Sequence, residues 1–289
     1  MGLDKKNLIV RAASGCIYVA LIVGAILLGF PATAILMLVF AIVAYFEFTT
    51  KIQKFYRFYP INHWLTAMDL LMILMMILGP CVTSSDQIGI ICTSGAIFFL
   101  LRLISEIFIA GKNPMLSIGI SLTSLFYIGV PLASLVVATR LMGAIPWFVV
   151  CTLAMIWIND TGAYIVGCTI GRHKLSPKIS PNKSWEGFLG GLLFNVGAAF
   201  IYFYCFNLRY FVVDQVWPWI LIGVGVTVFA TVGDLFESMI KRSIGVKDFG
   251  TAIPGHGGVL DRIDSLLFVV PTVLINSIIL ISPEFLLDI

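Results

Sequence analysis

Acidic side chains gather at the ends of two apolar runs in this sequence of 289 residues. Asp234, Glu237 and Lys241 follow one another at helical spacing, so a helix would present them on one face. Asp261 and Asp264 stand three residues apart at the start of the next apolar run. Carboxylates brought together at helix ends repel one another unless a cation lies between them, and their hard oxygen atoms favour Mg²⁺. The spacing therefore predicts a magnesium site formed by the two helix ends.

The segment between these two ends is rich in glycine and in basic residues. It contains the run Pro254-Gly255-His256-Gly257-Gly258, and glycines let backbone N–H groups approach phosphate oxygens closely. Four basic residues supply positive charge for a phosphate-rich substrate: Lys241, Arg242, Lys247 and Arg262. The alternative is a set of ordinary salt bridges, Asp234 with Lys241 and Asp261 with Arg262, with His256 closing a turn. We favour the metal–phosphate site.

A second polar stretch, 160–187, mixes basic residues with hydroxyls, prolines and glycines. Its core reads Ser180-Pro181-Asn182-Lys183-Ser184, and Ser184 is expected to cap the helix that follows. This composition favours a loop that binds an anion. The alternative is a positively charged loop that only fixes the orientation of the chain in a membrane.

The elements that must position these residues are membrane helices. Hydrophobic residues make up 60% of the sequence and charged residues 11%, with a mean hydropathy of +1.03, whereas about a quarter of a soluble domain is charged. The apolar runs are continuous rather than alternating, which favours helices over the strands of a barrel. We predict an all-α, polytopic integral membrane protein with about nine spans. The expected spans are 11–29, 32–48, 64–79, 88–107, 115–138, 145–170, 187–207, 217–240 and 264–282.

The basic residues predict the orientation of these spans. With a cytoplasmic N-terminus in the cell (inner) membrane, every Lys and Arg except Arg140 and Arg209 falls on the cytoplasmic side. We divide the single membrane domain into helices 1–144 and a catalytic part, 145–289. Three further acids, Glu47, Asp69 and Glu106, are expected to be structural. Glycines 162, 167 and 171 are expected to allow close helix packing.

The stretch from Ser238 to Asp264 resembles the signature of the phosphatidate cytidylyltransferases, or CDP-diacylglycerol synthases. It contains Lys241-Arg242, then Lys247-Asp248, then Pro254 to Gly258 followed by Val259-Leu260-Asp261-Arg262-Ile263-Asp264. The stretch 160–187 is similar to the same family, whereas the N-terminal half matches only in being hydrophobic. The resemblance implies that CTP and phosphatidate are converted into CDP-diacylglycerol and pyrophosphate, with Mg²⁺, for phospholipid biosynthesis.

The resemblance also implies roles for individual residues. Those expected at the metal are Asp234, Asp261 and Asp264. Those expected in catalysis are Asp261, Lys241, Arg242 and His256. Those expected to bind substrate are Lys183, Ser180, Lys247, Arg262, Gly257 and Gly258.

The expected partners are CTP, phosphatidate and membrane lipid, with no nucleic acid, and a homodimer is compatible with the sequence. Two rival functions are a secondary transporter, which would carry its polar residues near the midplane in a repeat, and a CTP-dependent lipid kinase, which would release CDP.

Overall fold

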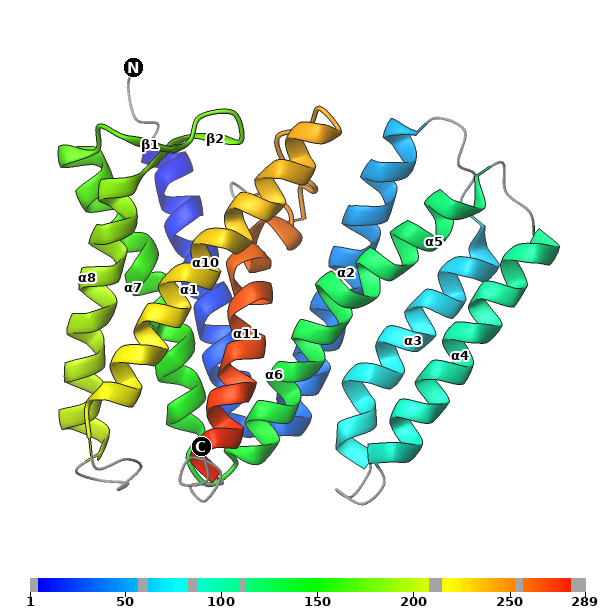
Figure 1. The fold of residues 1–289 in the computed structure, drawn as a ribbon, viewed down its shortest axis with the longest axis horizontal. Helices are drawn as coiled ribbons and strands as arrows, with labels where there is room; N and C mark the ends of the chain where they lie inside the picture. Colours follow the sequence, from blue (N-terminus) through cyan, green and yellow to red (C-terminus); the bar gives the residue numbers. More distant parts are fainter. Residues whose placement is uncertain are drawn as a thin grey trace. The chain divides into compact units, whose positions relative to one another are not determined.

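The fold was analysed in a computed structural model, which describes residues 5–56, 62–82, 88–109, 113–207, 215–252 and 257–281. Its helices are α1 Lys5–Leu28, α2 Phe30–Phe55, α3 His63–Val82, α4 Ile88–Ile109, α5 Pro114–Thr123, η2 Ser124–Gly129, α6 Val130–Leu141, α7 Pro146–Ile170, α8 Trp185–Tyr202, η3 Phe203–Asn207, α10 Trp217–Ser243 and α11 Leu260–Ile281 (Figure 1). Here η marks a π-helical turn. The expected membrane-protein fold is thus confirmed in its helical character.

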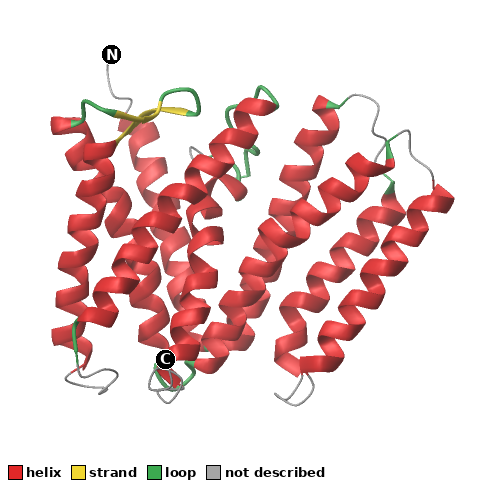
Figure 2. Cartoon of the chain, in the orientation of Figure 1, coloured by secondary structure: helices red, strands yellow, loops and turns green. Residues whose placement is uncertain are grey.

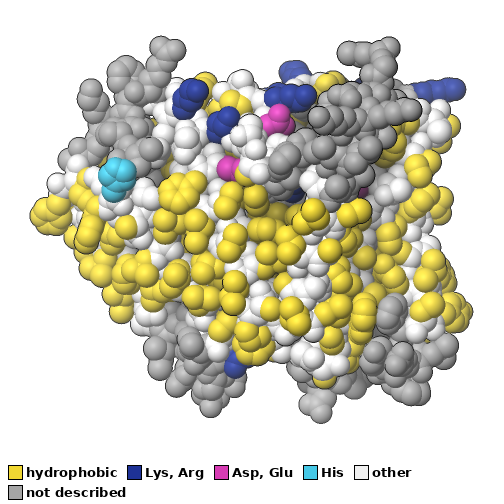
Figure 3. Space-filling view, turned by 180° about the vertical axis from the view of Figure 1, so that it is seen from behind, with side chains coloured by type: hydrophobic (Ala, Val, Ile, Leu, Met, Phe, Trp, Pro, Cys, Tyr) yellow, Lys and Arg dark blue, Asp and Glu magenta, His cyan; other side chains and the backbone are white. Residues whose placement is uncertain are grey.

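Seven helices among the described residues are long and apolar enough to cross a membrane. They match seven of the expected spans, and residues 14–28 of α1 form a shorter apolar helix. The fourth expected span coincides with α4. Large hydrophobic side chains such as Phe108 and Leu193 are exposed, and hydrophobic side chains fill a broad belt across the middle of the face drawn in Figure 3. A surface of this kind suits lipid as its solvent.

Proline and asparagine mark where several helices begin. A proline lies in the first turn of α2, α5, α7 and α10, where its missing N–H removes no helical hydrogen bond. Asn113 caps α5 because its side chain accepts a hydrogen bond from the backbone N–H of Leu116. Helix starts are therefore set locally by the sequence.

The segment between α7 and α8 is an antiparallel hairpin rather than the plain loop expected from the sequence. Strand β1 (Lys174–Ser176) pairs with β2 (Ser180–Ser184), with Lys174 opposite Ser184 and Ser176 opposite Ser180 (Figure 2). The hairpin leads directly into α8, whose N-cap is Ser184 as expected: the Ser184 hydroxyl accepts from the N–H of Gly187 at 3.1 Å.

Residue contacts divide the chain into two compact units. The first unit comprises Met1–Val137 and Val246–Arg262, and the second comprises Ala138–Gly245 and Ile263–Ile289. The division at residue 144 stays a prediction.

In the second unit, α7 and α8 lie side by side (Figure 1). A Cβ atom at Gly162 would lie 2.7 Å from Cγ of Phe194, and one at Gly190 would lie 2.5 Å from Cβ of Val166. The expected close packing through Gly162 is confirmed.

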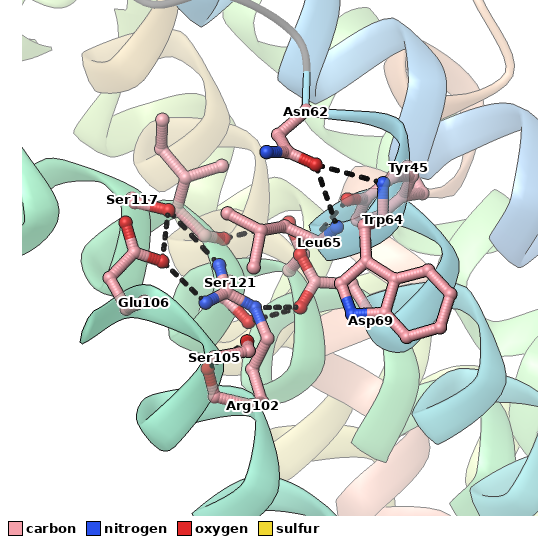
Figure 4. A network of polar contacts seen from close by, with 12 residues as sticks. Tyr45, Asn62, Trp64, Leu65, Asp69, Arg102, Ser105, Glu106, Ser117 and Ser121 are labelled. Atoms are coloured by element: carbon pink, nitrogen blue, oxygen red, sulfur yellow. Dashed lines mark hydrogen bonds and ion pairs between the residues drawn. The ribbon is translucent and has the colours of Figure 1, made fainter. Parts of the chain in front are cut away.

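In the first unit, a buried polar network joins α2, α3, α4 and α5 (Figure 4). At its centre the Arg102 guanidinium, on α4, donates to Asp69 on α3 at 3.1 Å and to Glu106 at 2.7 Å. It also donates to the Ser117 hydroxyl on α5 at 3.0 Å. Asp69 accepts further bonds from the hydroxyls of Ser121 and Tyr45, on α5 and α2. The structural role expected for Asp69 and Glu106 is confirmed.

Candidate active site

An ion pair joins the two sequence stretches singled out above. Nζ of Lys183, on β2, lies 2.6 Å from Oδ2 of Asp234, on α10. Both side chains are partly exposed, at 27% and 38%. The hairpin and the C-terminal part of α10 therefore lie on the same side of the second unit.

The last two turns of α10 hold a second ion pair. Nζ of Lys241 lies 2.6 Å from Oε2 of Glu237, one turn earlier on the same helix. Glu237 is 1% exposed, so its charge is stabilised by a partner at close range rather than by water. Asp234 also accepts a hydrogen bond from the Ser238 hydroxyl at 3.2 Å. The pairings that form are thus Lys183 with Asp234 and Lys241 with Glu237.

Two more aspartates belong to this cluster. Asp264, on α11, interacts electrostatically with Asp234, Asp160 and Lys241. Asp160, on α7, interacts with Lys183 and Asp234 and accepts a hydrogen bond from the Asn159 amide. The structure therefore places three aspartates from three helices of the second unit within electrostatic range of one another. Asp160 was missed as a site residue, although its place at the start of the polar stretch 160–187 was a usable signal.

This acidic cluster fits a magnesium ion in its donor atoms and its charge. Counting Glu237, four carboxylates share the two ammonium groups of Lys183 and Lys241. Among the described residues, no three His, Cys, Asp or Glu side chains stand close enough to form a closed metal cage. Mg²⁺ does not need one, because it is usually held by one or two carboxylates together with water and substrate phosphates. Asp234 and Asp264 are the expected ligands in this unit.

The Asp261 carboxylate organises the backbone of its own segment in the first unit. Its Oδ2 atom accepts hydrogen bonds from the N–H groups of Phe249 at 2.9 Å, Gly250 at 3.4 Å and Gly258 at 3.0 Å. Asp261 is 7% exposed. Gly257 has a φ of 85°, which strongly favours glycine. The N–H of Gly258, expected to face a phosphate, points at Asp261 in this structure.

A glutamate far away in the sequence holds the same segment. Both carboxylate oxygens of Glu47, on α2, accept backbone N–H bonds at the start of α11, from Val259 at 3.1 Å and from Leu260 at 2.9 Å. The sequence predicts a structural role for Glu47 but not these partners. Sequence reasoning missed this contact because more than two hundred residues separate the partners.

Glu186 fixes the base of the hairpin that carries Lys183. Its carboxylate accepts from the backbone N–H groups of Arg172 at 3.1 Å and His173 at 3.2 Å, and it lies 2.5 Å from Nδ1 of His173. Glu186 stands in the first turn of α8, directly after the Ser184 cap. The hairpin is therefore tied at its base to the start of α8, and Lys183 extends from a fixed frame.

The remaining expected site residues are placed as follows. Arg242, Lys247 and Arg262 are exposed, Ser180 is half-buried, and His256 lies outside the described residues. The Arg262 carbonyl accepts from the Tyr18 hydroxyl, on α1, at 3.1 Å. Asp234 and Asp264 belong to the second unit and Asp261 to the first, so their shared metal site stays a prediction.

Comparison with known proteins decides the family. The profile of the cytidylyltransferase family matches residues 9–280. The chain belongs to the cytidylyltransferase family. It is 45% identical over 126 residues to a protein of Staphylococcus haemolyticus (strain JCSC1435) named phosphatidate cytidylyltransferase. It is 47% identical over 128 residues to a protein of the same name from Staphylococcus aureus (strain COL). Each alignment covers 43% of this chain and 46% of the relative, so the match spans about half the length of these relatives.

Proposed function

We propose that this cytidylyltransferase family member transfers a cytidylyl group from CTP to phosphatidate, giving CDP-diacylglycerol and pyrophosphate. The observation that carries the proposal is the Lys183–Asp234 ion pair, which puts a basic hairpin beside an acidic cluster at one end of the second unit. An acidic cluster of this kind suits the metal that accompanies a nucleoside triphosphate. Basic side chains beside it suit the phosphates themselves.

The reaction needs positioning more than it needs proton transfer. The lipid phosphate is already an anion near neutral pH, so it attacks the α-phosphorus of CTP without a strong general base, and pyrophosphate leaves. Two polyanions must be held against their mutual repulsion, which is the task of Lys183, Lys241, Arg242, Lys247 and Arg262. Mg²⁺, when bound, would neutralise the triphosphate and stabilise the leaving group.

A product assay tests the reaction directly. Purified protein is supplied with CTP and phosphatidate in mixed micelles, and pyrophosphate, CDP and lipid-linked nucleotide are measured. We expect equal amounts of pyrophosphate and CDP-diacylglycerol. Release of CDP with a phosphorylated lipid would assign a lipid kinase instead. If neither pyrophosphate nor CDP is released, nucleotide chemistry on phosphatidate is refuted.

The hairpin provides a matched pair of lysines for the substrate role. Lys183 contacts the acidic cluster, whereas Lys178 lies exposed in the turn between β1 and β2. We expect Lys183→Met to lower kcat/KM for CTP by at least about tenfold, because one charged phosphate contact is lost. Lys178→Met should retain wild-type kinetics. Equal effects of the two substitutions would show that the hairpin acts only through its overall charge.

The metal dependence is proposed on the same cluster. EDTA should abolish turnover, and Mg²⁺ should restore it. Asp234→Asn keeps the shape of the side chain and removes one charge, so kcat should fall at least about a hundredfold. The sequence assigns Asp261 to the same metal, so Asp261→Asn should show a similar loss, and the double variant should be little worse than either. Losses that multiply would mean that the two aspartates act independently.

The orientation belongs to the proposal as well. We place the chain in the cell membrane with its N-terminus in the cytoplasm. The distribution of Lys and Arg supports this, because basic residues resist translocation. A nucleotide in the cytoplasm would then reach the site from the side that carries the hairpin.

A further inference from the structure

Glu47 is a charged residue that follows the long apolar run of helix α2. Helix α2 has no other acidic residue, and Glu47 lies more than two turns before its end. Charges within membrane helices are costly, so they generally have a specific polar partner. The partners of Glu47 are the backbone N–H groups of Val259 and Leu260, 212 and 213 residues further along the chain.

These N–H groups belong to the start of α11. The first N–H groups of a helix have no partner within the helix, and the helix dipole makes this end positive. A carboxylate that accepts from two of them is therefore stabilised by hydrogen bonds and by the dipole together. Glu47 acts as a cap for α11 that is supplied by another helix. A side chain in α2 thus fixes where α11 begins, one residue before Asp261.

The neighbouring glycines show how closely Glu47 approaches the segment. A Cβ atom at Gly258 would lie 2.5 Å from Oε2 and 2.7 Å from Oε1 of Glu47. A Cβ atom at Gly250 would overlap the same carboxylate. Two glycines of the segment are therefore needed to leave room for Glu47.

The segment is held between two carboxylates. Asp261 accepts from the N–H groups of Phe249, Gly250 and Gly258, and Glu47 occupies the space beside the Cα atoms of the same two glycines. The next residue on α2 adds an apolar contact, because the Phe48 ring packs at a tilt against the buried ring of Phe249, with the ring centroids 5.9 Å apart. The conformation of this segment thus depends on α2 as well as on its own sequence.

We propose that Glu47 is a positioning residue for the reaction, which acts by anchoring residues 258–260 at the start of α11 and so fixing the orientation of Asp261. This inference rests on the proposed function, in which Asp261 serves the nucleotide site. Displacing a reacting or charge-stabilising group by about 1 Å can lower turnover a hundredfold, so the anchor should be visible in kcat.

Hydrogen exchange tests the anchor without any reference to catalysis. In the full-length protein in detergent, the peptide covering residues 257–262 should exchange slowly in the wild type. In Glu47→Ala the N–H groups of Val259 and Leu260 lose their acceptor, so exchange in this peptide should rise at least about tenfold. Thr49→Val is the matched control, because Thr49 is also buried on α2 and its hydroxyl donates to the Tyr45 carbonyl of its own helix. Unchanged exchange in Glu47→Ala would overturn the anchor.

Kinetics then test whether the anchor serves the reaction. We expect kcat for CDP-diacylglycerol formation to fall about a hundredfold in Glu47→Ala. Glu47→Gln keeps one of the two acceptor oxygens, so it should recover part of that loss. Thr49→Val should keep wild-type kcat. Faster exchange with unchanged kcat would leave Glu47 a purely structural cap and overturn the positioning role.

Gly258→Ala separates the anchor from a direct role of glycine at the substrate. In the wild type the added methyl group meets Glu47, so kcat should fall strongly. In the Glu47→Ala background the three atoms nearest to the added methyl group are gone, so the same substitution should lower kcat much less than in the wild type. An equal further loss in that background would assign Gly258 to the substrate rather than to Glu47. If the wild type forms no CDP-diacylglycerol, the proposed function fails, while the exchange experiment still decides the anchor.

Discussion

Replacing Arg102 should destabilise the first unit more than replacing either of its acidic partners. The Arg102 side chain is 2% exposed and pairs with both Asp69 and Glu106. Arg102→Met keeps much of the length of the side chain but leaves two buried carboxylates without their shared cation. Breaking a buried ion pair by removing one partner costs about 3–5 kcal/mol. Glu106→Gln instead leaves one cation with one anion and should cost about 1 kcal/mol, as for the loss of one hydrogen bond.

Unfolding in detergent with a denaturant titration measures this difference. The free energy of unfolding should be lower by about 3–5 kcal/mol in Arg102→Met and by about 1 kcal/mol in Glu106→Gln. Ser105→Ala is the control, because the Ser105 hydroxyl donates to the backbone carbonyl of Arg102 and leaves the charges intact. Neutralising both Asp69 and Glu106 together with Arg102 should recover much of the loss. The reasoning is refuted if Glu106→Gln costs as much as Arg102→Met.

Three further outcomes are expected elsewhere in the chain. A Cβ atom at Gly191 would overlap the Asn159 amide, so Gly191→Ala should lower the free energy of unfolding by about 1–3 kcal/mol. A Cβ atom at Gly197, on the same helix, has no atom within 4 Å outside its own helix backbone, so Gly197→Ala should change the free energy of unfolding little. Ser184→Ala removes the N-cap of α8 and should cost about 1 kcal/mol in the same measurement, with recovery by aspartate. A reporter fused after Ile289 should respond as non-cytoplasmic and one inserted between β1 and β2 as cytoplasmic; finding both on one side would overturn the predicted topology.

Much of the fold could be predicted from the sequence because it depends on local features. Continuous apolar runs of membrane-spanning length predicted the helices, because in lipid the backbone N–H and C=O groups must bond within a helix or a closed barrel. Ser184, directly before such a run, predicted the N-cap of α8, and Gly162 predicted the close packing of α7 against α8. The hairpin was missed because Ser180-Pro181-Asn182-Lys183-Ser184 has neither alternating hydrophobicity nor β-branched residues.

The candidate site was predictable in its residue types but only partly in its pairings. Helical spacing put Asp234, Glu237 and Lys241 on one face, and Lys241 pairs with Glu237 one turn away on that face, whereas Asp234 pairs with Lys183 of the hairpin. Helical periodicity carries no information on contacts between distant helices. The role of Glu47 was hidden for the same reason, since its partners are backbone N–H groups, which carry no sequence signal.

The buried network of the first unit also constrains how the protein is made. Helix α4 carries Arg102 and Glu106 within its span, and α3 carries Asp69. Each such charge disfavours insertion of an isolated helix by about 2.5–3.5 kcal/mol, so neither helix is well suited to enter lipid alone. Because Arg102 bonds to Asp69, the two helices can enter as a pair that carries its own counter-charge. We therefore expect α3 to remain at the insertion machinery until α4 has been synthesised. A long insert between α3 and α4 should slow integration of the protein into the membrane more than the same insert in another loop.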